Sequence, residues 1–155
     1  MVVDDLNVFV DSISNYFQVT SEQSARVGTP FLTEDATPHI SDYTGIISIS
    51  GNYRGAVFFS APERMLMRLL RELGLMSTQE SQLLDLAGEI SNTLSGNARR
   101  KFGKNFKIMP PSNHRGNTTK MPNSELKKIF IIPIEWSELT ANLIISLESE
   151  SEVVH

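Results

Sequence analysis

The sequence predicts an α+β fold in which two halves, each a helix followed by three strands, contribute to a mainly antiparallel sheet. Stretches with apolar residues at helical spacing occur at the start of the chain and again in its middle. Runs rich in β-branched residues follow each of them, and short turns join these runs in pairs. The order of helix, three strands, two helices and three strands indicates two related halves, although no residue-level repeat is visible.

The composition is that of one ordinary domain, and we expect residues 1–155 to form it. With 155 residues and 40% apolar side chains, the chain is long enough to bury one core. A formal charge of -4 and a pI near 5.4 disfavour binding to nucleic acid, which needs a concentrated basic surface. Cysteine is absent, the first residues lack the basic stretch of a secretory signal, and no apolar run approaches the roughly 20 residues of a membrane span. We therefore expect a cytoplasmic protein that does not insert into membranes.

The first half is expected to contain a helix and three strands. Residues 4–17 place apolar side chains at helical spacing, which predicts an amphipathic helix. Residues 22–33 are weakly patterned and leave room for one short strand, and the polar run at 33–43 is typical of a loop. The β-rich runs TGIISIS and YRGAVFFS flank Gly51-Asn52, a pair suited to a tight hairpin turn. They predict two antiparallel strands.

Two helices are expected in the middle of the chain. The sequences SAPE (60–63) and STQE (77–80) both have the spacing of a capping box, in which the serine and the glutamate satisfy each other's backbone N–H groups. The first helix should end near Gly74, and the second, a long one, should continue to Gly103. The buried stripe of the first helix is predicted to be Met65, Leu66, Leu69, Leu70 and Leu73. The last turn of the second contains three cations that offset the helix dipole, Arg99, Arg100 and Lys101.

Three more strands are expected at 106–111, 126–136 and 139–148, with a turn at Ser137-Glu138 between the last two. Proline has no N–H to give to a neighbouring strand, so the strand that contains Pro133 should lie at a sheet edge or carry a bulge. The polar stretch 110–125 is predicted to be a loop, and residues 149–155 an acidic tail.

The long helix is unusual in what it exposes. Its sheet-facing side is predicted to consist of Leu83, Leu86, Ala87, Ile90, Leu94 and Ala98. Its opposite side is predicted to consist of Ser81, Asp85, Gly88, Glu89, Asn92, Ser95, Gly96 and Arg99. That side is short and flat, whereas a solvated helix face usually carries long helix-forming side chains. Gly88 and Gly96 together cost about 2 kcal/mol of helix stability relative to alanine, and something should offset that cost.

Two kinds of contact would offset it. A neighbouring helix of the same molecule could pack over the glycines, which would make the face structural. Alternatively, the missing β-carbons let a second protein approach while Glu89 and Asn92, three residues apart on one side, project into it. Asn97 points toward the apolar side instead, where a buried amide needs hydrogen-bond partners, and we interpret it as structural.

The residues of this helix resemble a known signature. The run Asp85-x-x-x-Glu89-x-x-Asn92, followed by Ser95-Gly96-Asn97-Ala98 and Pro110-Pro111, is similar to that of the CheC/CheX/FliY phosphatases of bacterial chemotaxis, most of all CheX. The motif-bearing part covers roughly residues 81 to 111, and the predicted order of elements is compatible with a CheC-like fold. Some CheC-like members carry a second copy of the motif on the matching helix of the other half. The first helix has Asp11-Ser12-Ile13-Ser14-Asn15, without a glutamate three residues before its asparagine, so we expect one active helix.

The resemblance implies an activity. In this family, the glutamate and asparagine of the motif remove phosphate from the phospho-aspartate of the response regulator CheY, and Glu89 and Asn92 match those two positions. The residues expected to contact the regulator around them are Asp85, Gly88, Gly96 and Arg99. Asn92 can hold a water with its amide, while Glu89 is expected to engage the regulator's lysine. Magnesium is expected to be held by the regulator, so the chain needs no cofactor of its own.

The family resemblance also implies a homodimer formed through the sheets, for which a strand edge near Ile129–Ile134 is a candidate contact. No metal site is predicted, because the three histidines show no ligand spacing, and neither a Walker-type loop nor a GxSxG elbow is present. Two other classes of function stay open. One is a non-catalytic module that binds a response regulator or flagellar switch component through the same helix face. The other is a structural adaptor, in which Gly96→Ala would lower thermal stability without changing the phosphorylation of any partner.

Overall fold

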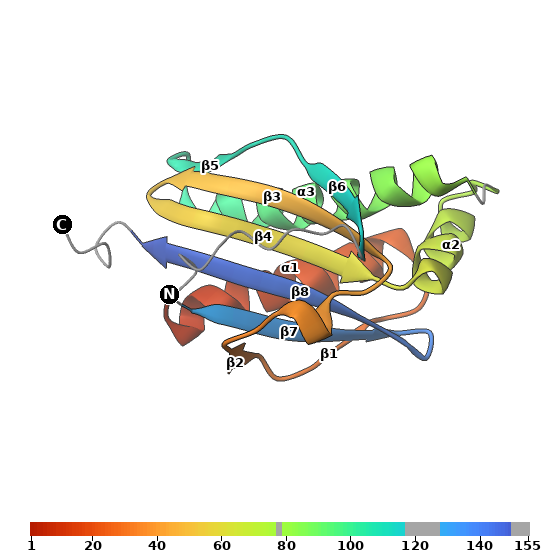
Figure 1. Cartoon of the computed structure of the whole chain (residues 1–155), viewed down its shortest axis with the longest axis horizontal. Helices are drawn as coiled ribbons and strands as arrows, with labels where there is room; N and C mark the ends of the chain where they lie inside the picture. Colours follow the sequence, from red (N-terminus) through yellow and green to blue (C-terminus); the bar gives the residue numbers. More distant parts are fainter. Residues whose placement is uncertain (77–78, 117–127, 150–155) are drawn as a thin grey trace.

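Three helices and one antiparallel sheet make up the part of the chain that the computed structural model describes, residues 1–76, 79–116 and 128–149 (Figure 1). The elements are α1 (Val3–Thr20), β1 (Arg26–Val27), β2 (Phe31–Thr33), the 3-10 turn η1 (Thr37–His39), β3 (Tyr43–Gly51), β4 (Tyr53–Ala61), α2 (Glu63–Glu72), α3 (Glu80–Phe102), β5 (Phe106–Ile108), β6 (Ser112–Arg115), β7 (Ile129–Trp136) and β8 (Leu139–Ser149). The predicted α+β class, with a long motif-bearing helix, is confirmed.

The sheet joins the two halves of the chain. Its order is β1-β7-β8-β4-β3-β5, with β2 also paired to β7 and β6 also paired to β3, and every pairing is antiparallel. The hairpin β3–β4 of the first half meets the hairpin β7–β8 of the second at the central β4–β8 pair. The short strands of each half pair with the hairpin of the other half. Each half therefore has two short strands in addition to its hairpin, one more than predicted.

The extra strands lie where the sequence predicts weak structure. Residues 22–33 form both β1 and β2, and β6 lies within the stretch 110–125 that was expected to be a loop. That expectation is wrong for β6, which pairs with the first residues of β3. Its side chains are polar and only partly buried, so it lacks the apolar alternation that marks a strand. The rest of the predicted loop after Gly116, and the predicted tail after Ser149, lie outside the described residues.

Both long hairpins close through backbone with positive φ. Gly51 has φ 97° at the β3–β4 turn, and Ser137 and Glu138 have φ 54° and 64° at the β7–β8 turn. Two consecutive residues with positive φ give the turn geometry whose twist matches that of the flanking strands. Both turns lie where the sequence predicts them.

The start of α2 differs from the prediction. Ser60 lies inside β4, where its hydroxyl is 2.8 Å from the Thr44 hydroxyl and accepts the Ser41 N–H at 2.7 Å. The N–H of Glu63 donates instead to the carboxylate of Asp42 at 2.8 Å. The predicted Ser60–Glu63 capping box is therefore wrong. β4 continues through Ser60, whose hydroxyl is hydrogen-bonded to Ser41 and Thr44 instead of to the start of α2.

The ends of α2 and α3 agree with the prediction only in part. Leu73 was expected in the buried stripe of α2, but it is 45% exposed because the helix ends at Glu72, so that expectation is wrong. α3 begins at Glu80, and Ser77, its expected capping residue, lies outside the described residues. The predicted end of α3 is confirmed, with Gly103 as its C-cap at φ 98°.

Pro133 faces a break between two strands. β1 and β2 pair with the same side of β7, and the chain between them passes Pro133. The N–H of Gly28 donates to the Pro133 carbonyl at 2.8 Å, on the side where proline has no N–H to offer. Because β1 and β2 pair with β7, the edge near Ile129–Ile134 is not exposed, and that part of the expectation is wrong. A homodimer formed through the sheets stays a prediction.

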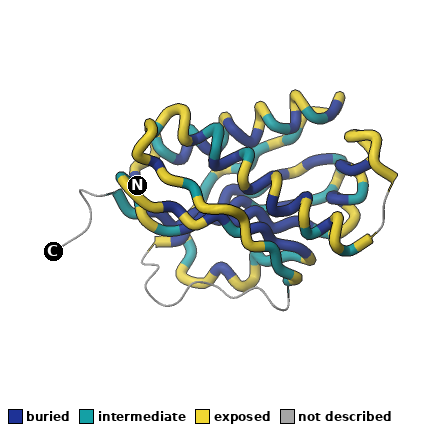
Figure 2. Tube along the Cα trace, turned by 90° about the horizontal axis from the view of Figure 1, so that it is seen from above, coloured by how far each residue is buried: buried dark blue, intermediate teal, exposed yellow. Residues whose placement is uncertain are grey.

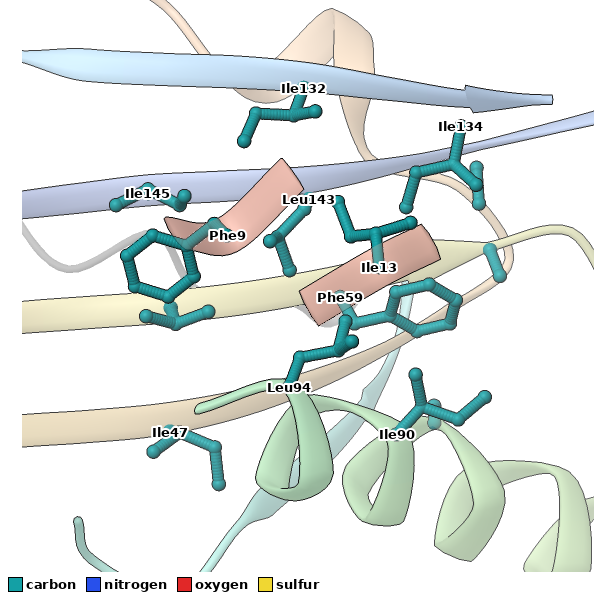
Figure 3. Packing of buried hydrophobic residues seen from close by; sticks show 14 of the residues in the cluster. Phe9, Ile13, Ile47, Phe59, Ile90, Leu94, Ile132, Ile134, Leu143 and Ile145 are labelled. Carbon is teal, nitrogen blue, oxygen red and sulfur yellow. The ribbon is translucent and has the colours of Figure 1, made fainter. Parts of the chain in front are cut away.

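The main core lies between the sheet and the helices (Figure 3). Its fully buried side chains include Phe9 and Ile13 of α1, Ile90 and Leu94 of α3, and Ile47, Phe59, Ile132, Ile134, Leu143 and Ile145 of the strands. The Ser12 hydroxyl donates to the Leu94 carbonyl at 3.0 Å, and the rings of Phe9 and Phe102 lie 5.9 Å apart. The two contacts show that α1 and α3 run antiparallel. Along the helices in Figure 2, buried and exposed residues alternate, so each helix has one outward side.

The opposite face of the sheet has a smaller apolar cluster. Ala36 and Ile40, on either side of η1, pack over Phe58 and neighbouring strand residues. The polar run at 33–43 therefore covers this face in addition to connecting β2 to β3. Within the described residues, no helix combines the length and the apolar character needed to cross a membrane.

Candidate functional site

α3 passes very close to the sheet at Gly45 of β3. A Cβ added at Gly45 would collide with the carbonyl oxygen of Ala87 and lie 2.6 Å from the Cα of Gly88. A residue without a side chain lets the helix backbone approach this closely. This contact fixes how closely the turn of α3 that precedes Glu89 approaches the sheet.

A second contact covers one flank of α3. A Cβ added at Gly88 would lie 2.7 Å from Cγ of Asn113 in β6. Gly88 and Ser95 are buried, so their predicted place on the exposed face is wrong. β5 and β6 pack along α3 in addition to β3, which widens its buried side, and β6 contacts Gly88 through Asn113. The cost of Gly88 is therefore offset inside the molecule, and Gly88 does not lie on the surface that a partner would touch.

The outward side of α3 carries the three polar residues of the predicted motif. Asp85, Glu89 and Asn92 are all exposed. Among the residues that the structure describes, the side chains of Glu89 and Asn92 have no hydrogen-bond or ion-pair partner. We call these three residues, together with Gly96, the α3 ridge. Its polar side chains are available to a second molecule.

Gly96 continues the α3 ridge and has open space beside it. Apart from the adjacent residues and backbone of α3 itself, no atom of the described residues lies within 4 Å of a Cβ added at this position. A glycine inside a helix costs about 1 kcal/mol relative to alanine, and at Gly96 no packing in the described part of the chain offsets that cost. The interpretation that a neighbouring helix packs over both glycines is therefore wrong. A strand, β6, covers Gly88, and no side chain of the described residues packs against Gly96.

Tyr16 of α1 lies within electrostatic reach of Glu89. Burial raises the pKa of Tyr16 to about 12, a hydrogen bond with Thr20 opposes this shift, and the Glu89 carboxylate adds to it. The phenol stays protonated at neutral pH, so it is a hydrogen-bond donor beside the α3 ridge. Sequence reasoning missed Tyr16, because no local pattern relates residues that only the packing of α1 on α3 brings together.

Two other predicted residues, Arg99 and Asn97, lie near the C-terminal end of α3, and Arg99 is exposed as predicted. The guanidinium of Arg99 donates to the carbonyls of Phe106 at 3.1 Å and Lys104 at 3.4 Å, so it ties the last turn of α3 to β5. Asn97, expected to face the apolar core, is half-buried and lines a groove between α1 and α3. That expectation is wrong because α1 covers only the inner flank of this turn.

A cluster of charged residues lies near the start of α3. Glu80 forms an ion pair with Arg115 of β6, and this arginine lowers the pKa of Glu80. Burial raises the pKa of Tyr43, and the charge of Glu80 adds to the shift. These residues line a cavity of about 600 Å³ and tie α3 to β3 and β6. In the described ranges, no three His, Cys, Asp or Glu side chains are placed to hold a metal ion.

The sequence matches one family model. Residues 43–135, more than half of the chain, match the model described as chemotaxis phosphatase CheX. The chain belongs to the CheX family. The match includes all of α3, and it confirms the family resemblance inferred from the Asp85 to Pro111 motif. No curated protein matches the sequence.

Solved structures share the fold of this CheX-family chain. A CheC-like superfamily protein from Shewanella sp. PV-4 is 25% identical with a TM-score of 0.81, and the alignment covers 96% of this chain and 100% of that one. CheX from Vibrio vulnificus is 22% identical with a TM-score of 0.79, covering 94% and 100%. A CheX–CheY–BeF3–Mg complex from Borrelia burgdorferi matches at 17% identity with a TM-score of 0.75, covering 96% and 100%.

Proposed function

We propose that this chain hydrolyses the phospho-aspartate of a CheY-like response regulator, and that Asn92 and Glu89 enter the regulator to do so. The observation that carries the proposal is the α3 ridge. Its polar side chains are exposed and have no partner within the described residues, and Gly96 beside them leaves open space. Membership of a family of chemotaxis phosphatases supports the activity, and the Borrelia structure contains CheX together with CheY.

Asn92 supplies the catalytic positioning. An acyl phosphate is already reactive, so its hydrolysis needs a water placed in line with the scissile P–O bond rather than a new covalent intermediate. A carboxamide has one acceptor and two donors and holds a water at a fixed angle, although it is too weak a base to remove the proton by itself. Because Asn92 has no internal hydrogen bond in the described structure, its amide is free to take up this water.

Glu89 supplies docking and orientation. A regulator's phosphoryl site contains a lysine and a divalent ion, and a carboxylate inserted beside them pairs with the lysine. Tyr16 lies within electrostatic reach of this carboxylate, and its hydroxyl is hydrogen-bonded to Thr20. In this proposal magnesium belongs to the regulator, and this chain holds no metal of its own.

A phosphate-release assay with a phosphorylated CheY-type receiver domain tests the proposal. Asn92→Ala is expected to lower kcat about a hundredfold, because misplacing the nucleophile has costs of that order. Glu89→Ala should lower kcat/KM. Gln82→Ala is the matched control, since Gln82 is an exposed amide on the same helix two turns before Glu89. Wild-type turnover in both the Asn92 and Glu89 variants would refute the assignment.

The same experiment addresses the non-catalytic alternative. A chain that binds the phosphorylated receiver without accelerating release of phosphate would be a response-regulator binding module that uses the α3 ridge for contact alone. Equilibrium binding is therefore measured in parallel with turnover, on the same protein preparations.

A further inference from the structure

A polar groove lies between α1 and α3, at the C-terminal end of α3. It encloses about 290 Å³. Its lining residues include Asp11, Ser12, Asn15, Asn97, Arg100 and Lys101. The Ser12 hydroxyl is already bonded to the Leu94 carbonyl, so the polar groups left to meet a ligand are two amides, two cations and one carboxylate.

The two cations of this groove are not used inside the molecule. Arg100 and Lys101 are exposed and form no ion pair or hydrogen bond within the described residues. By contrast, the guanidinium of the preceding residue, Arg99, donates hydrogen bonds to two backbone carbonyls. Offsetting the helix dipole accounts for cations in this last turn, but it does not require that two of them border a groove with amides on its walls. Asp11 is the single acid of the lining, so the groove carries a net positive charge.

The groove and the α3 ridge lie along one line. Arg100 follows Glu89 by eleven residues, which is three turns of an α-helix, so both side chains point in the same direction about 16 Å apart along the axis. Gly96 lies between them and has open space beside it. A rigid partner that rests on α3 can therefore reach both positions without meeting a side chain at Gly96.

We propose that this groove binds a carboxylate-bearing segment of the same phosphorylated regulator, so that Arg100 and Lys101 fix the direction in which the regulator docks on α3. The inference rests on the proposed function. A partner that offers a lysine to Glu89 and carboxylates to Arg100 and Lys101 fits the ridge in one direction and meets like charges in the other. Arg100 and Lys101 act as partner-binding residues and take no part in the chemistry.

Charge-reversal kinetics test this inference. For Arg100→Glu/Lys101→Glu, KM for the phosphorylated receiver domain should rise about tenfold at low salt while kcat is unchanged, because surface charges act mainly on association. Raising the salt concentration should reduce the difference in KM between this variant and wild type, because salt screens interactions between exposed charges. Asp11→Asn should lower KM about twofold, because it removes the groove's one repulsive charge. KM should therefore rise when the cations of α3 are reversed and fall when Asp11 of α1 is neutralised. Opposite changes in KM at the two sides of the groove would indicate a contact made in the groove itself.

The matched control is Arg64→Glu/Arg71→Glu, two exposed arginines of α2 that give the same change in net charge. In Figure 1, α2 lies beside the start of α3, whereas the residues of α3 that line the groove are at its C-terminal end. Equal changes in KM for both double variants would mean that net charge alone matters, and would overturn the inference. So would a wild-type KM in both the groove variant and Asp11→Asn.

Binding and turnover separate failure of this inference from failure of the proposed function. If wild-type protein releases phosphate and the groove variants match it, the groove has no role but the phosphatase assignment stands. If wild-type protein binds the receiver without releasing phosphate, the assignment fails, and the effect of the groove variants on Kd still decides the docking contact. Absence of any binding would refute both.

Discussion

Alanine at Gly96 and alanine at Gly88 should change the free energy of unfolding in opposite directions. At Gly96 the new methyl group meets nothing within 4 Å in the described structure beyond the adjacent residues and backbone of its own helix, so the variant keeps only the gain in helix propensity, about 1 kcal/mol. For a chain of this length, that gain raises Tm by about 2–4 °C. At Gly88 the methyl group would lie 2.7 Å from Cγ of Asn113. The Asn113 amide must move away from α3 to make room, and we expect the overpacking and the lost contact to cost about 1–3 kcal/mol and outweigh the same gain, so the variant should be less stable than wild type.

Urea unfolding followed by tryptophan fluorescence measures both changes. The chain has a single tryptophan, Trp136, which is 2% exposed and whose ring lies 5.8 Å from that of Phe17 in the core, so its emission reports loss of the folded state. A further variant, Gly96→Leu, tests function. The leucine side chain would project from the α3 ridge into open space, so the protein should stay folded, and it would obstruct a regulator resting on the ridge, so kcat/KM for the phosphorylated receiver should fall. If Gly96→Ala proved as destabilising as Gly88→Ala, Gly96 would have a packing role, and the argument for an open docking ridge would be refuted.

Three further changes test how α3 and α2 are held. Gly45→Ala is expected to cost about 3 kcal/mol, since its Cβ would meet helix backbone that cannot rotate aside; thermal melting measures this. Asp42→Ala should cost about 1 kcal/mol, because the Glu63 N–H loses its acceptor, and urea titration measures it. The folded pKa of Glu80 lies below its ordinary value of 4.5, so its contribution is present above about pH 4.5 and is lost as the pH falls through the folded pKa. The urea midpoint of Glu80→Gln should therefore vary less than that of wild type between about pH 5 and pH 3.

The parts of the fold that local chemistry determines could be predicted from the sequence. Gly51-Asn52 and Ser137-Glu138 mark turns because of backbone angles that neighbouring residues set among themselves. The apolar stripe of α3, with Ile90 and Leu94, follows from helical spacing alone. The same spacing places Glu89 on the outward side, so the exposed motif could be located before the structure was known.

Features that depend on distant segments could not be predicted. β6 is polar, and it is a strand only because the edge of β3 is available to pair with it. Once it pairs, its Asn113 lies against Gly88, which reversed the predicted exposure of that residue. The same holds for Asp42, which directly precedes β3 and accepts the Glu63 N–H at the start of α2, and for Tyr16, which the packing of α1 on α3 brings within electrostatic reach of Glu89.

The packing that brings α1 to α3 also explains why one helix carries the motif. The two helices are the equivalent elements of the two halves, and in α1 the position three residues before Asn15 is Ser12. Ser12 is buried and donates to the Leu94 carbonyl at 3.0 Å. A glutamate there would place a carboxylate against a carbonyl oxygen away from water, which is costly without a donor. The register of α1 on α3 therefore turns that position inward, whereas Glu89 of α3 faces solvent, which supports one active helix.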